Sequence, residues 1–191
     1  MTSTFDKAAL RLRMRDLRPR LAADAPNAAA RAARHLPLDR LPHFEAAAVY
    51  YAQGSELDPT PLARRLIAEG RTVALPVARR REGLLQFRHW TPGEALEPDA
   101  VGVPSPPPAA AAVTPQLVVA PLLAFDRRGG RLGQGGGHYD LTLQALRAAG
   151  AVFVLGLAYA GQLVDEIPME PHDQPLDAVL TEAGYIALRR D

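Results

Sequence analysis

Two long apolar runs limit the possible folds of this chain more than any other feature. They are LVVAPLLAF at residues 117–125 and AVFVLGLAY at residues 151–159, and neither alternates apolar with polar residues. Strands of this kind are buried on both faces, as in a parallel sheet covered by helices. Between them, residues 141–149 have the periodicity of a helix that ends at Gly150. The two runs therefore predict an α/β fold.

The remaining segments fit the same fold. Apolar runs at 44–52 and 71–77 flank a helical segment at 59–69, which predicts a right-handed parallel crossover. Further elements follow from periodicity and turn signals: helices at 7–21 and 27–36, strands at 84–90, 178–181 and 185–188, and an extended loop rich in Pro and Ala at 91–115. With 191 residues, the chain is predicted to form a single domain, 1–191. We expect a mostly parallel or mixed sheet flanked by helices.

The charge balance excludes partners that need a strong field of one sign. The 22 Lys and Arg against 21 Asp and Glu give a net charge of +1, which argues against nucleic acid and anionic membranes. The polar N-terminus and the lack of a long apolar segment argue against a signal peptide or a membrane helix. Without cysteine, thiolate metal sites and a cysteine nucleophile are excluded. We expect a cytoplasmic monomer whose partners are small molecules.

The first predicted helix has an apolar and a basic side. Leu10, Met14, Leu17 and Leu21 recur every three or four residues after an N-cap at Thr4 or Asp6, and the basic side lies next to them. The basic side is formed by Lys7, Arg11, Arg15 and Arg18. Lys7 is the only lysine, so it either marks a site that needs a compact positive charge, such as a phosphate site, or is an ordinary surface residue.

A glycine-rich turn joins the strand predicted at 117–125 to the helix that follows. It contains six glycines, at 129, 130, 133, 135, 136 and 137. Backbone amides of such a turn, together with a helix N-terminus, can bind phosphate, whereas the alternative is a mobile loop. The spacing fits neither the Walker nor the dinucleotide fingerprint. We therefore predict a strand-to-helix phosphate loop of another type.

Charged residues near this turn extend the predicted phosphate site. Arg131 can bind a phosphate with two parallel hydrogen bonds, and Asp140 suits a hard divalent cation. Magnesium commonly takes one or two carboxylates, and Asp173 and Asp177 are both candidates for the second. We expect Lys7 and Arg131 to lie at the surface of the cleft, so that their removal would cost little stability.

Several separate motifs occur in a characteristic order. They are KAALR at 7–11, VYYAQGSELDP at 49–59, VALPV at 73–77, LLAFDRRGGRLGQGGGHYD at 122–140 and AYAGQLVDEIPMEPHDQPLDAVLTE at 158–182. In these motifs the chain resembles the 5-formyltetrahydrofolate cyclo-ligases, also called methenyltetrahydrofolate synthetases. The resemblance implies closure of 5-formyltetrahydrofolate to 5,10-methenyltetrahydrofolate with ATP and Mg²⁺, through a phosphorylated formyl group, releasing ADP and phosphate.

The resemblance also implies roles for individual residues. Lys7 and Arg131 are the expected catalytic cations, and Asp140 and Asp173 the expected Mg²⁺ ligands. The expected ATP site comprises Lys7, Ala8, Ala9, Leu10, Arg11, Arg131, Leu132, Gly133, Gln134, Gly135, Gly136, Gly137, His138 and Tyr139. The expected folate site comprises Tyr51, Glu56, Gln134, Gly135, Gly136, Gly137 and His138.

Other interpretations stay open on the sequence alone. The same loop could serve a kinase or hydrolase with another acceptor, or a non-catalytic protein that binds folate or nucleotide. Ser105 and Leu141 depart from the family pattern, which often has glutamate and arginine there, and His138 stands where tyrosine is frequent. Gln162 and Trp90 are more simply explained as a loop amide and a residue at the edge of the core.

Overall fold

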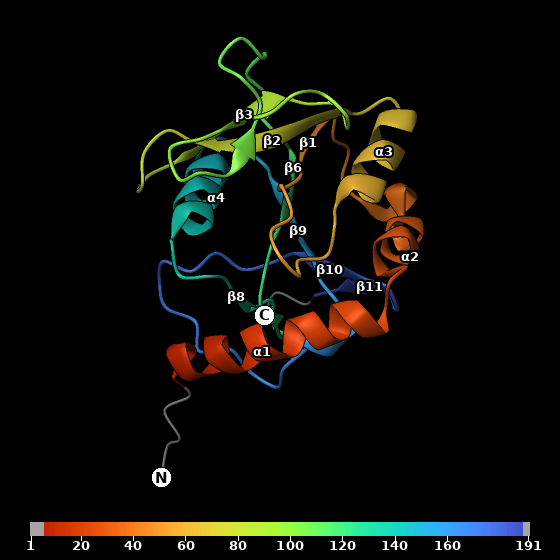
Figure 1. Cartoon of the computed structure of the whole chain (residues 1–191), viewed down its shortest axis with the longest axis vertical. Coiled ribbons are helices and arrows are strands. Elements are labelled where there is room, and N and C mark those ends of the chain that lie inside the picture. The colour runs from red at the N-terminus through yellow and green to blue at the C-terminus, as the bar shows by residue number, and fades with distance from the viewer. Residues whose placement is uncertain (1–5, 189–191) are drawn as a thin grey trace.

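The computed structural model describes residues 6–188, which form a seven-stranded sheet with helices on both faces (Figure 1). The strand order is β11-β10-β9-β6-β1-β2-β3. The strands are β1 (Ala46–Ala48), β2 (Thr72–Ala78), β3 (Leu85–His89), β6 (Leu117–Ala120), β9 (Phe153–Leu157), β10 (Ala178–Thr181) and β11 (Gly184–Ala187). The five strands from β10 to β2 run parallel, and the edge strands β3 and β11 pair antiparallel. The predicted mixed α/β sheet is confirmed.

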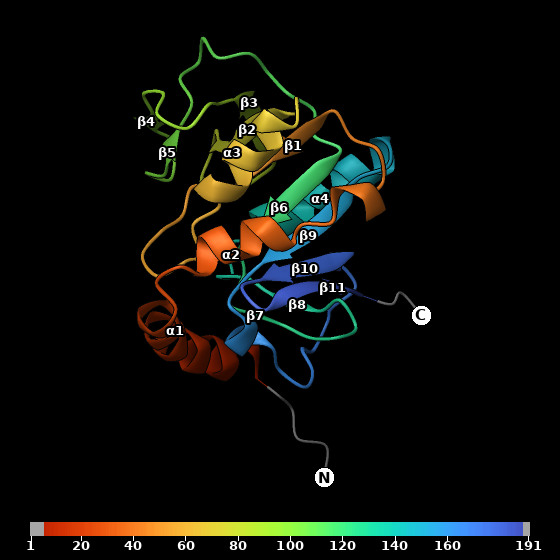
Figure 2. The same ribbon diagram turned by 90° about the vertical axis from the view of Figure 1, so that its right-hand side faces the viewer.

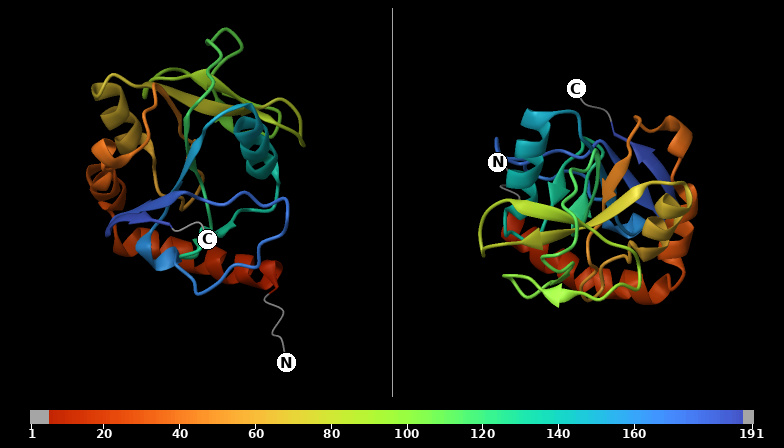
Figure 3. Two further views of the ribbon diagram at one scale, coloured as in Figure 1. Left: turned by 180° about the vertical axis from the view of Figure 1, so that it is seen from behind. Right: turned by 90° about the horizontal axis from the view of Figure 1, so that it is seen from above.

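Two helices cover one face of the sheet and one covers the other. α2 (Ala28–His35) and α3 (Thr60–Ala68) lie on the same face, as Figure 2 shows from the side. α4 (His138–Ala149) packs Leu143 against the opposite face, and the view from above in Figure 3 separates the two layers. The apolar strands predicted at 117–125 and 151–159 supply β6 and β9, which lie between these layers.

A third cluster of buried apolar side chains lies beyond the carboxyl ends of the parallel strands. α1 (Lys7–Asp24) buries Leu10 and Met14 against Leu123, Leu132 and Ile167. Asp6 caps the helix, because its side chain accepts a hydrogen bond from the amide of Ala8 at 2.9 Å. The alternative cap, Thr4, lies outside the described residues. The predicted apolar and basic sides of α1 therefore face different surroundings.

The predicted strand at 117–125 is wrong beyond Ala120. Pro121 cannot donate to a central ladder, and the chain continues as a hairpin of β7 (Ala124–Phe125) and β8 (Arg131–Leu132). Asp126 holds the hairpin turn, accepting hydrogen bonds from the amides of Arg128 at 2.9 Å and Gly130 at 2.8 Å. Gly129 and Gly130 thus belong to a structural turn, and only the later glycines lead into α4.

Three other boundaries differ from the sequence prediction. α4 begins at His138, not at 141, since Gly137 adopts the left-handed conformation at the N-cap and Thr142 donates to the His138 carbonyl at 2.6 Å. β1 occupies only three residues of the predicted 44–52. The predicted loop at 91–115 contains a two-stranded ribbon, β4 (Glu97–Pro98) with β5 (Pro104–Ser105). Short 3₁₀ turns occur at η1 (Leu38–Arg40) and η2 (Ala160–Gln162).

Within residues 6–188, no helix combines the length and apolar character needed to span a bilayer.

Candidate active site

A cavity of about 870 Å³ opens where the parallel strands end. Tyr50, just after β1, and Pro121, just after β6, both line it. The chain passes from β1 to β2 on one side and from β6 to β9 on the other, so the strand order reverses between β1 and β6. Open α/β sheets bind ligands at such reversal points, in sites of about 300–1,000 Å³. The fold alone therefore makes this cavity the candidate active site.

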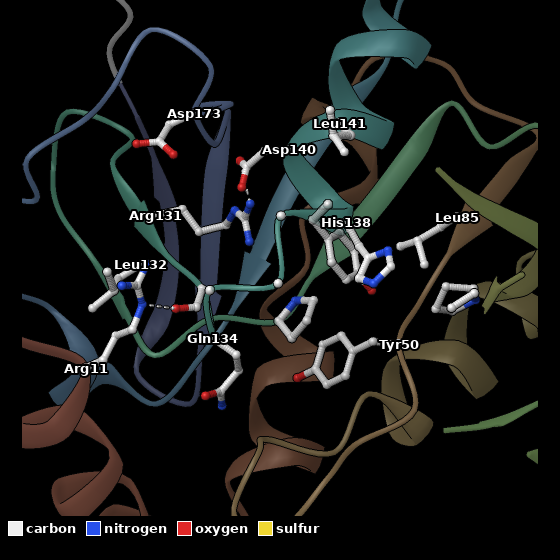
Figure 4. A pocket seen from close by; sticks show the side chains of 18 of the residues that line it. Arg11, Tyr50, Leu85, Arg131, Leu132, Gln134, His138, Asp140, Leu141 and Asp173 are labelled. Carbon is white, nitrogen blue, oxygen red and sulfur yellow. Dashed lines mark hydrogen bonds and ion pairs between the residues drawn. The ribbon is translucent and has the colours of Figure 1, made fainter. Parts of the chain in front are cut away.

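The basic side of α1 faces the cavity and the glycine-rich loop. Arg11 donates from Nε to the carbonyl of Gly133 at 3.0 Å, a contact drawn in Figure 4. Arg15 donates to the side-chain oxygen of Gln134 at 3.0 Å and to its carbonyl at 3.2 Å. These bonds attach residues 133–134 to α1. The predicted basic stripe thus positions the loop.

The loop between β8 and α4 approaches the cavity with its backbone. Gly133, Gln134, Gly135, Gly136, Gly137, His138 and Tyr139 all line the cavity. Gly135 and Gly137 have φ angles of +103° and +70°, values that residues with a Cβ rarely adopt. The first amides of α4 have no intrahelical acceptor and favour an anion at this end. Phosphate binding by this loop remains a prediction that the geometry supports.

Arg131 is buried beside the loop. Its side chain is only 4% exposed, and Nη2 pairs with Oδ1 of Asp140 at 2.7 Å. The guanidinium also lies over the ring of Tyr139, 5.8 Å from its centre, and Nε is buried with no hydrogen-bond partner among the described residues. The expectation that Arg131 lies at the cleft surface is wrong, because the hairpin β7–β8 holds it inside. It still lines the cavity.

Lys7 contacts two carboxylates from the C-terminal part of the chain. Its ammonium lies 2.5 Å from Oδ2 of Asp173 and 3.3 Å from Oε2 of Glu170. Burial alone would raise the pKa of Asp173, but the Lys7 hydrogen bond and the Glu170 amide hold it below its ordinary value. Ala8 and Leu132 also line the cavity, whereas Ala9 does not and Leu10 is buried against the hairpin. Lys7 and Asp173 are thus brought together from residues far apart in sequence.

The two carboxylates predicted to bind metal, Asp140 and Asp173, both line the cavity. The amide of Gln174 donates to Oδ1 of Asp140 at 3.0 Å, so the loop containing Asp173 is attached to α4. The Arg131 guanidinium and the Gln174 backbone amide both donate to this one oxygen. The Lys7 ammonium and the Glu170 backbone amide both donate to Oδ2 of Asp173. Within residues 6–188, no hydrogen-bond donor reaches the second oxygen of either carboxylate. Oδ1 of Asp173 has only His172 Nε2 nearby among the described residues, at 3.8 Å. Each carboxylate therefore has an oxygen that fits the donor set that Mg²⁺ prefers.

The other candidate for this role, Asp177, lies elsewhere. Its Oδ2 accepts from the amide of Val154 at 2.7 Å and lies 3.3 Å from Arg147, so it holds β9 in place. By contrast, Glu170 and His172 bring ligand atoms within 4.8 Å of Asp173. The sequence prediction missed these two residues, although the contiguous EPHD segment was a usable signal.

The expected folate residues lie at the other end of the cavity. Tyr51 is 40% exposed and Glu56 is largely buried, and both line the cavity with Tyr50 and Tyr139. Burial raises the pKa of Glu56, although the Gln53 amide and Arg18 act in the opposite direction. Burial and the Glu56 carboxylate also raise the pKa of Tyr139, so its phenol stays protonated at neutral pH. This end of the cavity therefore combines aromatic rings with one carboxylate.

The loop at 91–115 contributes to the cavity wall. Asp99, Val101 and Val103 line the cavity, and Asp99 accepts a hydrogen bond from the amide of Ala78 at 2.9 Å. Gln162 and Trp90 are structural, as their simpler interpretations predicted. The side-chain Nε2 of Gln162 donates to the backbone carbonyls of residues 122 and 123, and Trp90 is buried in the core.

Comparisons with known proteins show the family of this chain. Residues 3–182 match the family model of the 5-formyltetrahydrofolate cyclo-ligase family. The chain belongs to this family. A 5-formyltetrahydrofolate cyclo-ligase of Mycolicibacterium smegmatis is 38% identical over 148 residues, which cover 73% of this chain and 75% of the relative. That of Escherichia coli K12 is 37% identical, covering 70% and 76%.

A solved member of similar architecture supports the fold. The NMR structure of the Aquifex aeolicus 5,10-methenyltetrahydrofolate synthetase matches with a TM-score of 0.76 and 25% identity. The match covers 97% of this cyclo-ligase family member and 94% of the Aquifex chain.

The departures from the family pattern lie at different depths. Ser105 is buried in β5, where its hydroxyl lies 3.3 Å from the Glu97 carbonyl, and it does not line the cavity. Leu141 is 48% exposed on the cavity rim. His138 contacts the carbonyl of Gly83 through Nδ1 at 2.9 Å, which connects the loop to the β2–β3 turn. None of the three changes the pairing of Lys7 or Arg131.

Proposed function

We propose that this protein closes 5-formyltetrahydrofolate to 5,10-methenyltetrahydrofolate, converting ATP to ADP and phosphate. The observation that carries the proposal is the composition of one cavity. At one end lie Lys7, Arg11 and Arg131, the two carboxylates predicted to bind metal and a glycine-rich loop, and at the other lie aromatic rings and Glu56. A triphosphate suits the first end, and a flat ring with N–H groups suits the second. Membership of the cyclo-ligase family supports this reading.

The first chemical step is transfer of the terminal phosphoryl group. A formamide carbon is a poor electrophile, and its oxygen is a poor leaving group. When the formyl oxygen attacks the γ-phosphorus in line and ADP departs, an iminium phosphate corrects both deficiencies. Such a transfer needs positioning and charge neutralisation and no protein nucleophile. Lys7, Arg11 and Arg131 supply the cations, and the loop amides fix the phosphate oxygens.

The second step closes the ring. N10 of the folate attacks the activated carbon and loses its proton, and the C–O bond breaks to release phosphate. The reaction requires the formyl group to lie between N10 and the γ-phosphate. Gln134 to His138 line the cavity, and the proposal assigns them contacts with both ligands.

We infer that Asp140 and Asp173 hold the Mg²⁺ that accompanies ATP. Each carboxylate has one oxygen without a hydrogen-bond donor in the described structure, as oxygen ligation requires. Bound there, Mg²⁺ would neutralise charge on the phosphate oxygens. Lys7 and Arg131 would then be available to neutralise the phosphates.

A spectrophotometric assay tests the proposed function. The methenyl product absorbs in the near ultraviolet and the formyl substrate does not, so absorbance must rise when the protein, 5-formyltetrahydrofolate, ATP and Mg²⁺ are combined. Omission of ATP or Mg²⁺ is the control and should abolish the rise. ADP formation that is indifferent to the folate would instead indicate a kinase or hydrolase. Saturable binding without turnover would indicate a non-catalytic binding protein.

A further inference from the structure

Arg18 is a buried cation at the folate end of the cavity. It lies in α1, its side chain is 8% exposed, and it contributes to the cavity lining. Nε donates to the hydroxyl of Ser55 at 3.1 Å, and Nη1 lies 3.5 Å from Oε1 of Glu56. Nη1 is buried and has no hydrogen-bond partner among the described residues. A buried guanidinium in this position is costly unless it serves a neighbouring anion.

Glu56 is held on two sides. Oε2 accepts a hydrogen bond from the amide of Gln53 at 3.0 Å, and the Glu56 amide donates to the Gln53 carbonyl at 3.1 Å. Oε1 faces Arg18. The carboxylate is therefore fixed by its own turn and by α1, while its side chain is 11% exposed toward the cavity.

We propose that Arg18 is a positioning residue for folate binding, which keeps the Glu56 carboxylate ionised and oriented for a ring that presents adjacent N–H donors. The inference rests on the proposed function, because it assigns the pterin to the Glu56 end of the cavity. A pterin offers such donors in its amino group and the neighbouring ring N–H. Only an ionised carboxylate accepts from both, since a protonated one must donate through one of its oxygens.

Two groups favour the ionised form of Glu56, the Gln53 amide and Arg18, and only Arg18 carries a charge. Burial raises the pKa of Glu56, so the ionised form needs support. The other titratable groups that interact with it are Tyr50, at the end of β1, and Tyr139, in α4. Burial raises the pKa of both phenols, so neither adds or removes charge near neutral pH. Arg18 is the cation that lowers the pKa of Glu56.

The direction of the pH effect follows from this arrangement. Without Arg18, the pKa of Glu56 rises further, and a larger fraction of the protein carries a protonated Glu56 near neutral pH. Folate affinity should then fall at the acid side of the profile and recover as pH increases. ATP affinity should change little, because Lys7 and Arg131 lie at the other end of the cavity.

The experiment compares wild type with Arg18→Met, Arg18→Lys, Glu56→Gln and the double variant R18M/E56Q. Arg20→Met is the matched control, because Arg20 is exposed on the same helix and does not line the cavity. KM for 5-formyltetrahydrofolate, KM for ATP and the pH profile of kcat/KM are measured for each. Calorimetry gives the Kd of 5-formyltetrahydrofolate, and urea unfolding checks that each variant folds.

We expect Arg18→Met to raise the folate KM about 10-fold at pH 7, to leave the ATP KM within about twofold, and to move the acid limb of the profile to higher pH. The folate KM of Arg18→Lys should lie between those of the wild type and Arg18→Met. The double variant should be no worse than Glu56→Gln, because Arg18 acts through Glu56. An unmoved acid limb, additive losses, or equal changes in both KM values would overturn the role of Arg18.

Failure of the proposed function is separable from failure of this inference. If the wild type forms no methenyl product, the proposed function is wrong. Calorimetry can still compare the Kd of 5-formyltetrahydrofolate for the wild type, for Arg18→Lys, which retains the charge, and for Arg18→Met, which does not. Equal Kd values for wild type, Arg18→Lys and Arg18→Met would overturn the inference even in an active enzyme.

Discussion

Two of the cations expected to bind the triphosphate, Lys7 and Arg131, are each paired with a carboxylate expected to bind Mg²⁺. Lys7 pairs with Asp173 at 2.5 Å, and Arg131 pairs with Asp140 at 2.7 Å. Under the proposed function, Mg²⁺ bound with ATP would be held by the two carboxylates, and Lys7 and Arg131 would face the phosphates. Either ligand alone would leave one set of charges without compensation. Nucleotide and metal should therefore bind cooperatively.

Lys7→Ala should separate these two effects. ATP binding should weaken about 10-fold or more, because a charge-assisted contact to phosphate is lost. Mg²⁺ alone should bind more tightly than it does to the wild type, because Asp173 is released. Isothermal titration with ATP and with Mg²⁺, each without the other, measures both. Arg13→Ala is the matched control on an exposed position of α1 outside the cavity. Weaker Mg²⁺ binding in Lys7→Ala would contradict this arrangement of cations and carboxylates.

Arg131→Ala should differ from Lys7→Ala in stability. The Arg131 side chain is 4% exposed and packs over Tyr139, whereas that of Lys7 is 17% exposed. Loss of Arg131 should lower the free energy of unfolding by about 1–3 kcal/mol, since Asp140 loses its partner and the packing loses volume. Loss of Lys7 should cost about 1 kcal/mol, because Asp173 loses a partner but no buried ring loses its packing. Urea denaturation of both variants measures the difference, and equal losses would be inconsistent with the burial of Arg131.

At the scale of elements, the sequence predicts what periodicity and turn residues determine. Helices α2 and α3 and strands β2, β3 and β10 occur within a residue or two of their predicted bounds. The strand predicted at 117–125 is too long, because the apolar character of the sequence continues past Pro121 while the hydrogen-bonded ladder does not. The predicted start of α4 is too late, because Gly137 caps the helix through its left-handed backbone, and a glycine in the sequence does not reveal that conformation.

Gly137→Ala tests the backbone at this junction. Gly137 has φ of +70°, and an alanine there should lower the free energy of unfolding by about 1–2 kcal/mol. Gly136→Ala is the matched control, because its φ is not positive and the added Cβ would lie 3.6 Å from the His138 ring, an ordinary contact. Urea denaturation compares the two. A Gly137→Ala protein as stable as Gly136→Ala would contradict the assigned conformation.

On the scale of the whole molecule, the site is assembled from segments that no local pattern connects. Motif chemistry points to Lys7, Arg131, Asp140 and the glycine-rich loop, with Asp173 or Asp177 as a second carboxylate. Family resemblance adds Glu56 and favours Asp173. The ion pairs between these cations and carboxylates are not predictable, because they depend on how α1 crosses the carboxyl ends of the parallel strands. The contact of Arg18 with Glu56 has the same origin. Most residues that the sequence predicts for the site therefore line the cavity, whereas the contacts between them are not predictable from local patterns.

Ligands should stabilise this assembly as one unit. A ligand present at 100 times its Kd adds about 2.7 kcal/mol to the free energy of unfolding. For a domain of this size, ATP with Mg²⁺ should raise Tm by roughly 5–10 °C, in a single transition. Differential scanning calorimetry measures this, with Lys7→Ala as the variant expected to show a smaller rise. Two transitions that respond separately to ATP would contradict the single domain predicted for 1–191.

The contact between Lys7 and Asp173 spans 166 positions of the chain. At synthesis rates of about 5–20 residues per second, the ribosome produces these partners roughly 10–30 seconds apart. During that interval a nascent polypeptide already carries α1 and then the glycine-rich loop, yet lacks the carboxylate that completes their surroundings. Newly made chains should therefore acquire nucleotide affinity only near the end of translation.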